Sequence, residues 1–201
     1  GRSRGLGDVY KRQPMTSVHL AEAIKEFNPM FFEDPIQIDS IISQSDIAKK
    51  VSIPIANGER MHSIWEFREL LANGGPQYVR PDVGLAGGIT QTKKIASIAE
   101  SYPSALITHN FLGPILTAAS VHIDVSIPNF ITQEYSLDDE SEKNNYLISS
   151  LKREGGYIIT PEKPGLGIEI NKEIINQVPY EPLDLNDQVP YRLDGSNAFS
   201  V

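Results

Sequence analysis

Five side chains able to bind a cation or transfer a proton recur along the chain at intervals of about 20 to 27 residues: Glu33, Glu59, Asp82, His109 and Glu134. Carboxylates are ligands for hard cations, and both carboxylates and imidazoles act as acids and bases. Each of the five lies at or just after the end of a short apolar run. Chemistry that uses them together therefore needs an architecture in which the ends of successive runs meet.

The segments between these residues alternate in character. The apolar runs predict short strands over residues 30–32, 53–56, 77–80, 105–108 and 130–132. Amphipathic stretches predict helices over residues 16–27, 41–50, 63–72, 89–101 and 112–125. Alternating strands and helices imply an α/β protein with a parallel sheet and right-handed crossovers. Open sheets and barrels both fit, but five successive strand ends that carry reactive side chains favour the rim of a barrel.

The remaining segments show no such alternation. Residues 1–13 are basic and glycine-rich, and they resemble translated adapter sequence or a disordered tail. Residues 14–135 form the β/α part, whereas residues 136–201 are expected to be a loop and a C-terminal segment that packs on other elements. Within that last segment, residues 136–145 read as a loop and residues 157–170 as extended chain around Pro-Gly turns. Trp65 and the phenylalanines are expected in the core.

Composition narrows the class of protein. The chain of 201 residues has a formal net charge of −8, which argues against nucleic acid as a partner. It contains no cysteine, so disulfides and thiolate metal sites are excluded. No apolar run approaches the ~18 residues that a membrane span needs. No membrane partner and a cytoplasmic location are therefore expected.

The motifs FFEDPI, NGERM, RPDVGLAGGIT, THNFLGP, PNFITQEY and KPGLGIEI follow one another in the order typical of one family. Over residues 14–201 the sequence resembles the enolase superfamily, its mandelate racemase subgroup and, within that, galactonate dehydratase-like acid-sugar dehydratases. The resemblance implies a partial (β/α)7β TIM-type barrel with about the last five strands. An N-terminal capping domain and the first barrel strands would be missing from this chain.

The resemblance also implies a reaction. The family removes a proton next to a carboxylate and stabilises the resulting enediolate with Mg²⁺, a hard dication suited to concentrated negative charge. Glu33 and Glu59 match two metal ligands of the family, and the first ligand, an Asp on the preceding strand, is absent. Without the family context, either glutamate would read as a charge stabilised by a helix dipole.

Three further residues match catalytic positions. His109 and Asp82 resemble the family's His–Asp dyad, in which the carboxylate orients the imidazole that takes the proton from C2 of the sugar acid. Glu134 matches the acid that hydrogen-bonds the substrate carboxylate, for which it should be protonated. Arg60 either balances Glu59 or contacts substrate. Gln133 is expected to be structural, and His62 to be a surface or loop residue.

These matches predict a carbon–oxygen lyase that converts an aldonate such as galactonate or gluconate to a 2-keto-3-deoxy acid. A racemase or epimerase of a 2-hydroxy acid, with a second base on the opposite face, is one alternative, and a non-catalytic barrel is another. The parent protein is expected to be a homo-oligomer that binds a small acid sugar. The chain by itself is expected to be impaired or inactive, because it lacks a metal ligand and an acid.

Overall fold

Four short parallel strands form the centre of the β/α part. The structure is a computed structural model that describes residues 14–37 and 40–179; predictions for residues 1–13 and beyond 179 lie outside the described residues. The strands are β1 (Phe32–Glu33), β2 (Ile55–Asn57), β3 (Tyr78–Val79) and β4 (Ala105–Leu106), hydrogen-bonded in chain order. This order, with a helix in each crossover, is that of a partial β/α barrel and confirms the predicted fold class.

The sheet continues past its regular strands through single bridges. Asp82 bridges to His109, and Leu106 bridges to Phe130, both in parallel orientation. The fifth expected strand is thus reduced to one bridge, with the backbone N–H of Ile131 donating to the carbonyl of Leu106 at 3.2 Å. The five repeated units are present, although the last contributes little regular strand.

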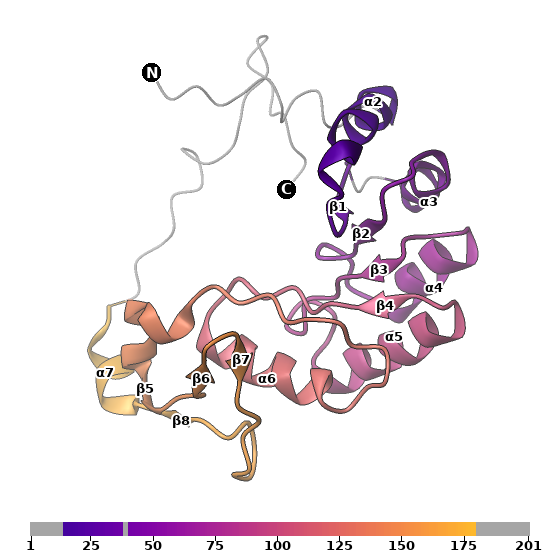
Figure 1. The fold of residues 1–201 in the computed structure, drawn as a ribbon. Helices are drawn as coiled ribbons and strands as arrows, with labels where there is room; N and C mark the ends of the chain where they lie inside the picture. Colours follow the sequence, from indigo (N-terminus) through magenta and orange to yellow (C-terminus); the bar gives the residue numbers. More distant parts are fainter. Residues whose placement is uncertain (1–13, 38–39, 180–201) are drawn as a thin grey trace.

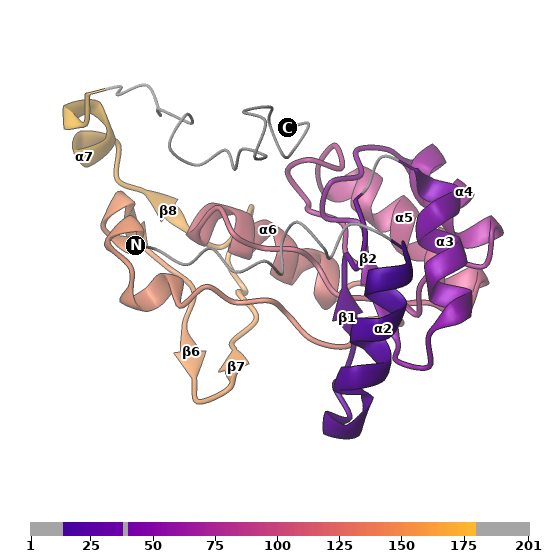
Figure 2. The same ribbon diagram turned by 90° about the horizontal axis from the view of Figure 1, so that it is seen from above.

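The helices follow the predicted pattern closely. They are α2 (Pro14–Ile24) continued by the 3₁₀ turn η1 (Lys25–Phe27), α3 (Ile41–Lys50), α4 (Ile64–Ala72), α5 (Ile89–Ser101) and α6 (Pro114–Asp124). Neighbouring helices contact one another, and Figures 1 and 2 show α3, α4 and α5 side by side along one face of the sheet. No helix among the described residues is long and apolar enough to cross a membrane.

Local sequence explains where helix α4 begins. The hydroxyl of Ser63 accepts a hydrogen bond from the N–H of Glu66, while a carboxylate oxygen of Glu66 accepts from the Ser63 hydroxyl and from the N–H of His62. This reciprocal capping satisfies backbone donors that the first helical turn leaves free. The start of α4 is therefore fixed by residues that follow the end of β2 by only a few positions.

The core lies between the sheet and the helices. It is built from aliphatic side chains around Phe67, including Leu70, Val79, Ile95, Leu106 and Ile123. The expectation that Trp65 belongs to this core is wrong, because Trp65 is 63% exposed. Residues two positions apart in a helix lie about 200° apart around its axis, so the burial of Phe67 turns Trp65 toward solvent. Phe27 and Phe111 are also exposed.

The first strand is less buried than predicted. Met30 is exposed, and Phe31 and Phe32 are only half-buried. Among the described residues, β1 pairs with β2 alone and forms one edge of the four-stranded sheet. A strand with a neighbour on one side only leaves part of its surface uncovered, which is why an apolar run does not guarantee burial here.

The C-terminal part is built from short elements, drawn in orange and yellow in Figure 1. The stretch 136–145, expected to be a loop, instead contains the 3₁₀ helices η2 (Asp138–Glu140) and η3 (Glu142–Tyr146). The stretch 157–170 has a strand at each end, with bends and a turn at residues 163–167 between them, which agrees with the prediction of extended segments around Pro-Gly turns. Antiparallel pairs join β5 (Leu147–Ser149) to β8 (Glu169–Ile170) and β6 (Arg153–Glu154) to β7 (Tyr157–Ile158), before α7 (Lys172–Gln177).

Candidate active site

His109 and Asp82 form a hydrogen-bonded pair where their two strand ends meet. His109 Nδ1 lies 2.9 Å from Asp82 Oδ2, and His109 Nε2 lies 3.5 Å from Glu59 Oε2. Asp82 is 1% exposed, and its Oδ1 accepts the N–H groups of Gly84 at 2.8 Å and Leu85 at 3.0 Å. Asp82 is thereby locked in place, and it orients the imidazole with Nε2 toward Glu59.

The same contacts set the charge of the pair. Burial opposes ionisation of Asp82, but the His109 hydrogen bond and the two backbone N–H groups outweigh it and lower the Asp82 pKa. The hydrogen bond to Asp82 raises the pKa of His109 against the effect of burial, with further help from Glu59 and Glu134. The pair is therefore arranged as an oriented acid–base group.

Two of the predicted glutamates, Glu33 and Glu134, contact a buried arginine. Arg80 Nε is 2.5 Å from Glu33 Oε1, and Arg80 Nη2 is 2.6 Å from Glu134 Oε2. Glu33 ends β1 and Glu134 follows the last bridge, so one guanidinium reaches both from the end of β3. The structure thus brings all five predicted residues together, and Arg80 joins them. We call this set the acidic rim: Glu33, Glu59, Arg80, Asp82, His109 and Glu134.

Glu33 is unusually easy to protonate. Its pKa is raised to about 7, chiefly by burial. Arg80 lowers the pKa, while the carboxylates of Asp34, Glu59 and Glu134 raise it. Asp34, held by a 2.8 Å hydrogen bond from Asn57 Nδ2, also has a raised pKa, chiefly because it is buried. Negative charge in this region is therefore only partly compensated by the protein.

The rim has the character, but not the full ligand number, of a hard-cation site. Glu33 and Glu59 offer oxygen ligands, the type that Mg²⁺ prefers. With all five carboxylates ionised, counting Asp34, and with Arg80, Arg60 and a protonated His109 opposite them, two negative charges remain. One divalent cation would balance these charges and would favour the ionised form of Glu33. Within the part of the chain that the structure describes, no three His, Asp or Glu side chains are arranged to hold a metal. The two glutamates thus fit a partial ligand set.

Glycine at position 58 sets the direction of Glu59. Its φ of +134° is one that other residues rarely adopt, and a Cβ there would lie 2.6 Å from Cε1 of Phe67. The backbone between Asn57 and Glu59 therefore passes directly over the core phenylalanine. This close approach lets the chain turn at the end of β2 and point Glu59 toward His109.

Asn110 holds Glu134 in position. Its backbone N–H donates to Glu134 Oε2 at 2.8 Å, and its side-chain amide donates to the Glu134 carbonyl at 3.0 Å. Glu134 Oε2 therefore already accepts two donors, Asn110 and Arg80, which leaves Oε1 as the oxygen available to a substrate. The expectation that this residue is protonated stays a prediction.

The other predicted residues have clear surroundings. Arg60 Nε lies 3.5 Å from Glu59 Oε1 with the Arg60 side chain 51% exposed, an arrangement that favours charge balance over substrate contact. Gln133 accepts from the Thr108 hydroxyl at 2.9 Å and donates to the Glu134 carbonyl at 2.7 Å, which agrees with a structural role. His62 is exposed, as expected.

Arg80 was not among the predicted site residues. The residue is only 4% exposed, and its guanidinium also lies 5.8 Å from the centre of the Phe31 ring. A signal was present: side chains alternate between the two faces of a strand, so Arg80 shares a face with Asp82 two residues later. A charged residue in line with a predicted site residue, inside an apolar run, indicates a buried ion pair.

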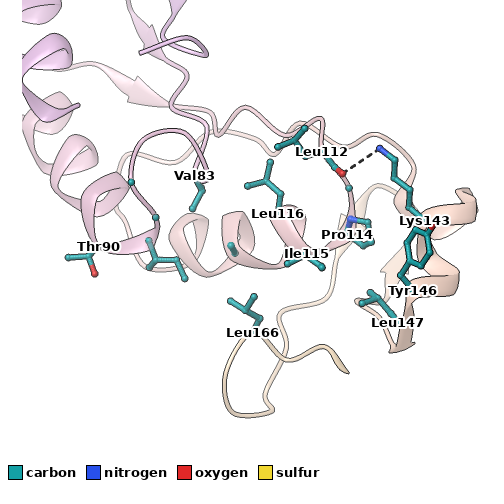
Figure 3. Close-up of a pocket in the computed structure, with 16 residues that line it drawn as sticks. Val83, Thr90, Leu112, Pro114, Ile115, Leu116, Lys143, Tyr146, Leu147 and Leu166 are labelled. Carbon is teal, nitrogen blue, oxygen red and sulfur yellow. Dashed lines mark hydrogen bonds between the residues drawn. The ribbon is translucent and has the colours of Figure 1, made fainter. Parts of the chain in front are cut away.

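A separate apolar pocket lies beside α6. Its volume is about 800 Å³, and it is lined by the starts of α5 and α6, Lys143 and Tyr146 of η3, and Leu147 and Leu166. Figure 3 shows Leu112, Leu116 and Val83 on one side of it and Tyr146, Leu147 and Leu166 on the other, with Lys143 donating to the Leu112 carbonyl. It contains no residue of the acidic rim.

Comparison with known proteins gives consistent matches. The family described as "Enolase C-terminal domain-like" matches residues 8–174. The D-galactonate dehydratase of Ralstonia nicotianae is 37% identical over 191 residues, which are 92% of this chain and 50% of the relative. That of Variovorax paradoxus is 36% identical over 185 residues, 89% of this chain and 48% of the relative. The chain thus spans about half the length of these relatives.

Solved structures agree with the fold. A mandelate racemase/muconate lactonizing enzyme from Jannaschia sp. CCS1 is 35% identical with a TM-score of 0.80, over 86% of this chain and 44% of that one. An enolase from Agrobacterium radiobacter, solved with bound Na and L-malate, is 28% identical with a TM-score of 0.85. This match covers 94% of this chain and 51% of the enolase chain. The family match spans both the β/α part and the acidic rim.

Proposed function

Because the chain belongs to the enolase C-terminal domain-like family, we propose that its acidic rim is part of a Mg²⁺-dependent site that removes water from a sugar acid. The observation that carries the proposal is the His109 geometry. Its Nδ1 is held by Asp82 at 2.9 Å, and its Nε2 lies 3.5 Å from Glu59. The D-galactonate dehydratase relatives favour an aldonate as substrate.

In this proposal His109 is the base. Its Nε2 takes the proton from C2 of the sugar acid, and Asp82 stabilises the imidazolium that forms. The C3 hydroxyl then leaves as water, with a proton from an acid that the described residues do not supply, and the resulting enol becomes a 2-keto-3-deoxy acid. No oxidant or reductant is needed, because the reaction only removes water.

Glu33 and Glu59 are the residues that would hold the metal. When bound, Mg²⁺ would supply positive charge to the carboxylate oxygens of the substrate, where negative charge develops after the proton is lost. The excess of carboxylates in the rim supports this role. Glu134 would contact the substrate carboxylate through Oε1, because its Oε2 already accepts hydrogen bonds from Arg80 and Asn110.

The test is a substrate screen that separates dehydration from racemisation. The chain, and a longer protein that contains it and matches the relatives in length, would be incubated with Mg²⁺ and a library of aldonates and aldarates. With D2O as the solvent, dehydration yields a 2-keto-3-deoxy acid, whereas racemisation yields only an epimer with a solvent-derived deuterium at C2. We expect keto acid from the longer protein and little turnover from the chain alone.

The matched control is the variant Glu59→Gln, which keeps the size of the side chain but removes a candidate ligand charge. We expect it to lose turnover even when the Mg²⁺ concentration is raised. Epimer without keto acid, or turnover that survives both chelation and this substitution, would contradict the proposed dehydration.

A further inference from the structure

We propose that Arg80 is a positioning residue that competes with a cation for Glu33 and thereby couples metal binding to the charge of Glu134. The inference rests on the proposed function, because it assumes that Glu33 is a metal ligand. It adds a residue to the site for which the sequence analysis had no role. It also gives the two sides of the rim, Glu33 at the first strand and Glu134 after the last bridge, a physical link.

The geometry carries the first step. One guanidinium lies 2.5 Å from Glu33 through Nε and 2.6 Å from Glu134 through Nη2, and the Arg80 side chain is only 5% exposed. A guanidinium is planar and rigid, so it can hold two carboxylates in a fixed relation that an ammonium group cannot. Solvent screens these contacts only in part, because the guanidinium is buried while the Glu33 and Glu134 side chains are 33% and 35% exposed.

The two contacts are not equivalent. Arg80 Nη2 makes a hydrogen bond to Glu134 Oε2. By contrast, Arg80 Nε and Glu33 Oε1 are both buried and, among the described residues, neither has a hydrogen-bond partner, although they form a close ion pair. The contact therefore has charge attraction without hydrogen-bond alignment. A carboxylate oxygen held in this way is the one most readily passed to another cation.

Coupling follows from sharing one charge. A divalent cation bound by Glu33 would draw the negative charge of this carboxylate away from Arg80 and weaken their contact, after which the guanidinium would interact more strongly with Glu134. Conversely, when Glu134 carries no charge, Arg80 pairs with Glu33 alone. This stronger pairing makes binding of the cation to Glu33 less favourable. Linkage requires the two effects to be equal in free energy.

The experiment measures binding of Mn²⁺ without substrate, by electron paramagnetic resonance, to a longer protein that contains the chain and matches the relatives in length. We expect Arg80→Gln to tighten Mn²⁺ binding about five-fold or more, and Glu134→Gln to weaken it by a similar factor when Arg80 is present. In the double variant, Glu134→Gln should have no effect beyond that of Arg80→Gln. A residue with a purely structural role would not produce this pattern.

Arg60→Gln is the matched control. It also removes a guanidinium next to a candidate ligand, Glu59, but at 3.5 Å and with the arginine half exposed. We expect it to change Mn²⁺ affinity less than about two-fold, because solvent screens such pairs. If Arg80→Gln does not fold, Arg80→Lys replaces it: the lysine keeps the charge but cannot hold both carboxylates, so Glu134→Gln should again lose its effect.

The outcomes separate the two proposals. No Mn²⁺ binding by that longer protein, or binding that Glu59→Gln leaves intact, would overturn the proposed metal site and the inference with it. Binding that Glu59→Gln abolishes, but that Arg80 and Glu134 substitutions leave unchanged, would overturn the inference alone. Weaker binding in Arg80→Gln would also overturn it, because competition predicts the opposite sign.

Discussion

The acidic rim and the apolar pocket beside α6 differ in what they could do. The pocket is a roomy concavity, about 800 Å³, yet among its lining residues Lys143 and Tyr146 are the only ones with a titratable side chain. The rim has titratable side chains in direct contact, with His109 between Asp82 and Glu59. The pocket is built largely from the ends of helices, and the rim from strand ends that the parallel sheet forces together.

The difference shows that room and reactivity are separate properties. An apolar concavity binds by excluding water, whereas proton transfer needs oriented groups whose pKa values are shifted by their neighbours. In this chain the parallel sheet supplies those neighbours at its carboxyl edge. Substitutions in the rim should therefore change chemistry, and substitutions around the pocket should change stability.

The largest effect is expected at His109. The variant His109→Asn should lower the rate of sugar-acid dehydration by about 10²- to 10⁴-fold, because it removes the base while keeping a group that can bond Asp82. The rate of keto-acid formation measures this, in a longer protein that matches the relatives. The midpoint of urea unfolding should change little. A His109→Asn variant that loses stability but keeps its rate per folded molecule would contradict the view that the rim governs chemistry and not stability.

Replacing a leucine in the core by alanine should destabilise the fold more than replacing a leucine that lines the pocket. Leu70→Ala should destabilise by about 3–5 kcal/mol, because Leu70 is wholly buried in the core and its removal leaves a cavity. Leu116→Ala should cost only about 2 kcal/mol, because Leu116 already borders the pocket on one side. Urea unfolding of both variants measures the difference. Equal costs would mean that the pocket is filled in solution.

Asp124 tests whether a titrating carboxyl outside the rim affects stability alone. Asp124 is 6% exposed, and burial raises its pKa to about 8, although the Thr108 hydroxyl lowers it. A raised folded pKa stabilises the fold at low pH, and this stability is lost as pH rises from about 4 toward 8. Asn cannot ionise. As pH rises, the free energy of unfolding of Asp124→Asn should therefore increase relative to that of the wild type, by on the order of 1–3 kcal/mol near pH 8.

Urea unfolding at pH 5 and pH 8 measures the difference in free energy of unfolding between Asp124→Asn and the wild type. The matched control is Asp139→Asn, at a partly exposed carboxylate whose pKa is lowered by contacts with Tyr135 and Arg153. That variant should not gain stability relative to the wild type as pH rises, because its carboxylate is stabilised in the charged form. If the stability of Asp124→Asn relative to the wild type fell toward pH 8, the raised pKa of Asp124 would be contradicted.

The smallest effect is expected at Trp65. Trp65→Ala should change the free energy of unfolding by no more than about 0.5 kcal/mol, because the side chain is exposed on the outer face of α4. Phe67→Ala, two residues away, is the matched control and should cost about 3–5 kcal/mol. A large loss at Trp65 would mean that another surface covers it.

Much of the fold was predictable because its signal is local. Periodic apolar residues placed α5 over residues 89–101, and the structure has it at Ile89–Ser101. The strands were harder, because pairing depends on distant partners: residues 130–132 keep one bridge. Residues 136–145 carry no periodic pattern, and their 3₁₀ turns depend on contacts such as the Arg153 ion pair with Asp139.

The β/α alternation in the sequence is enough to predict which reactive residues meet, since it places Glu33, Glu59, Asp82, His109 and Glu134 at one edge of a parallel sheet. The balance of their charges, by contrast, depends on contacts that form only in the folded chain. Arg80 reads as one more strand residue until two carboxylates from distant segments are seen to flank it. Spacing along a chain reports which edge a side chain reaches, whereas ion pairing depends on distances of a few ångströms between segments far apart in sequence.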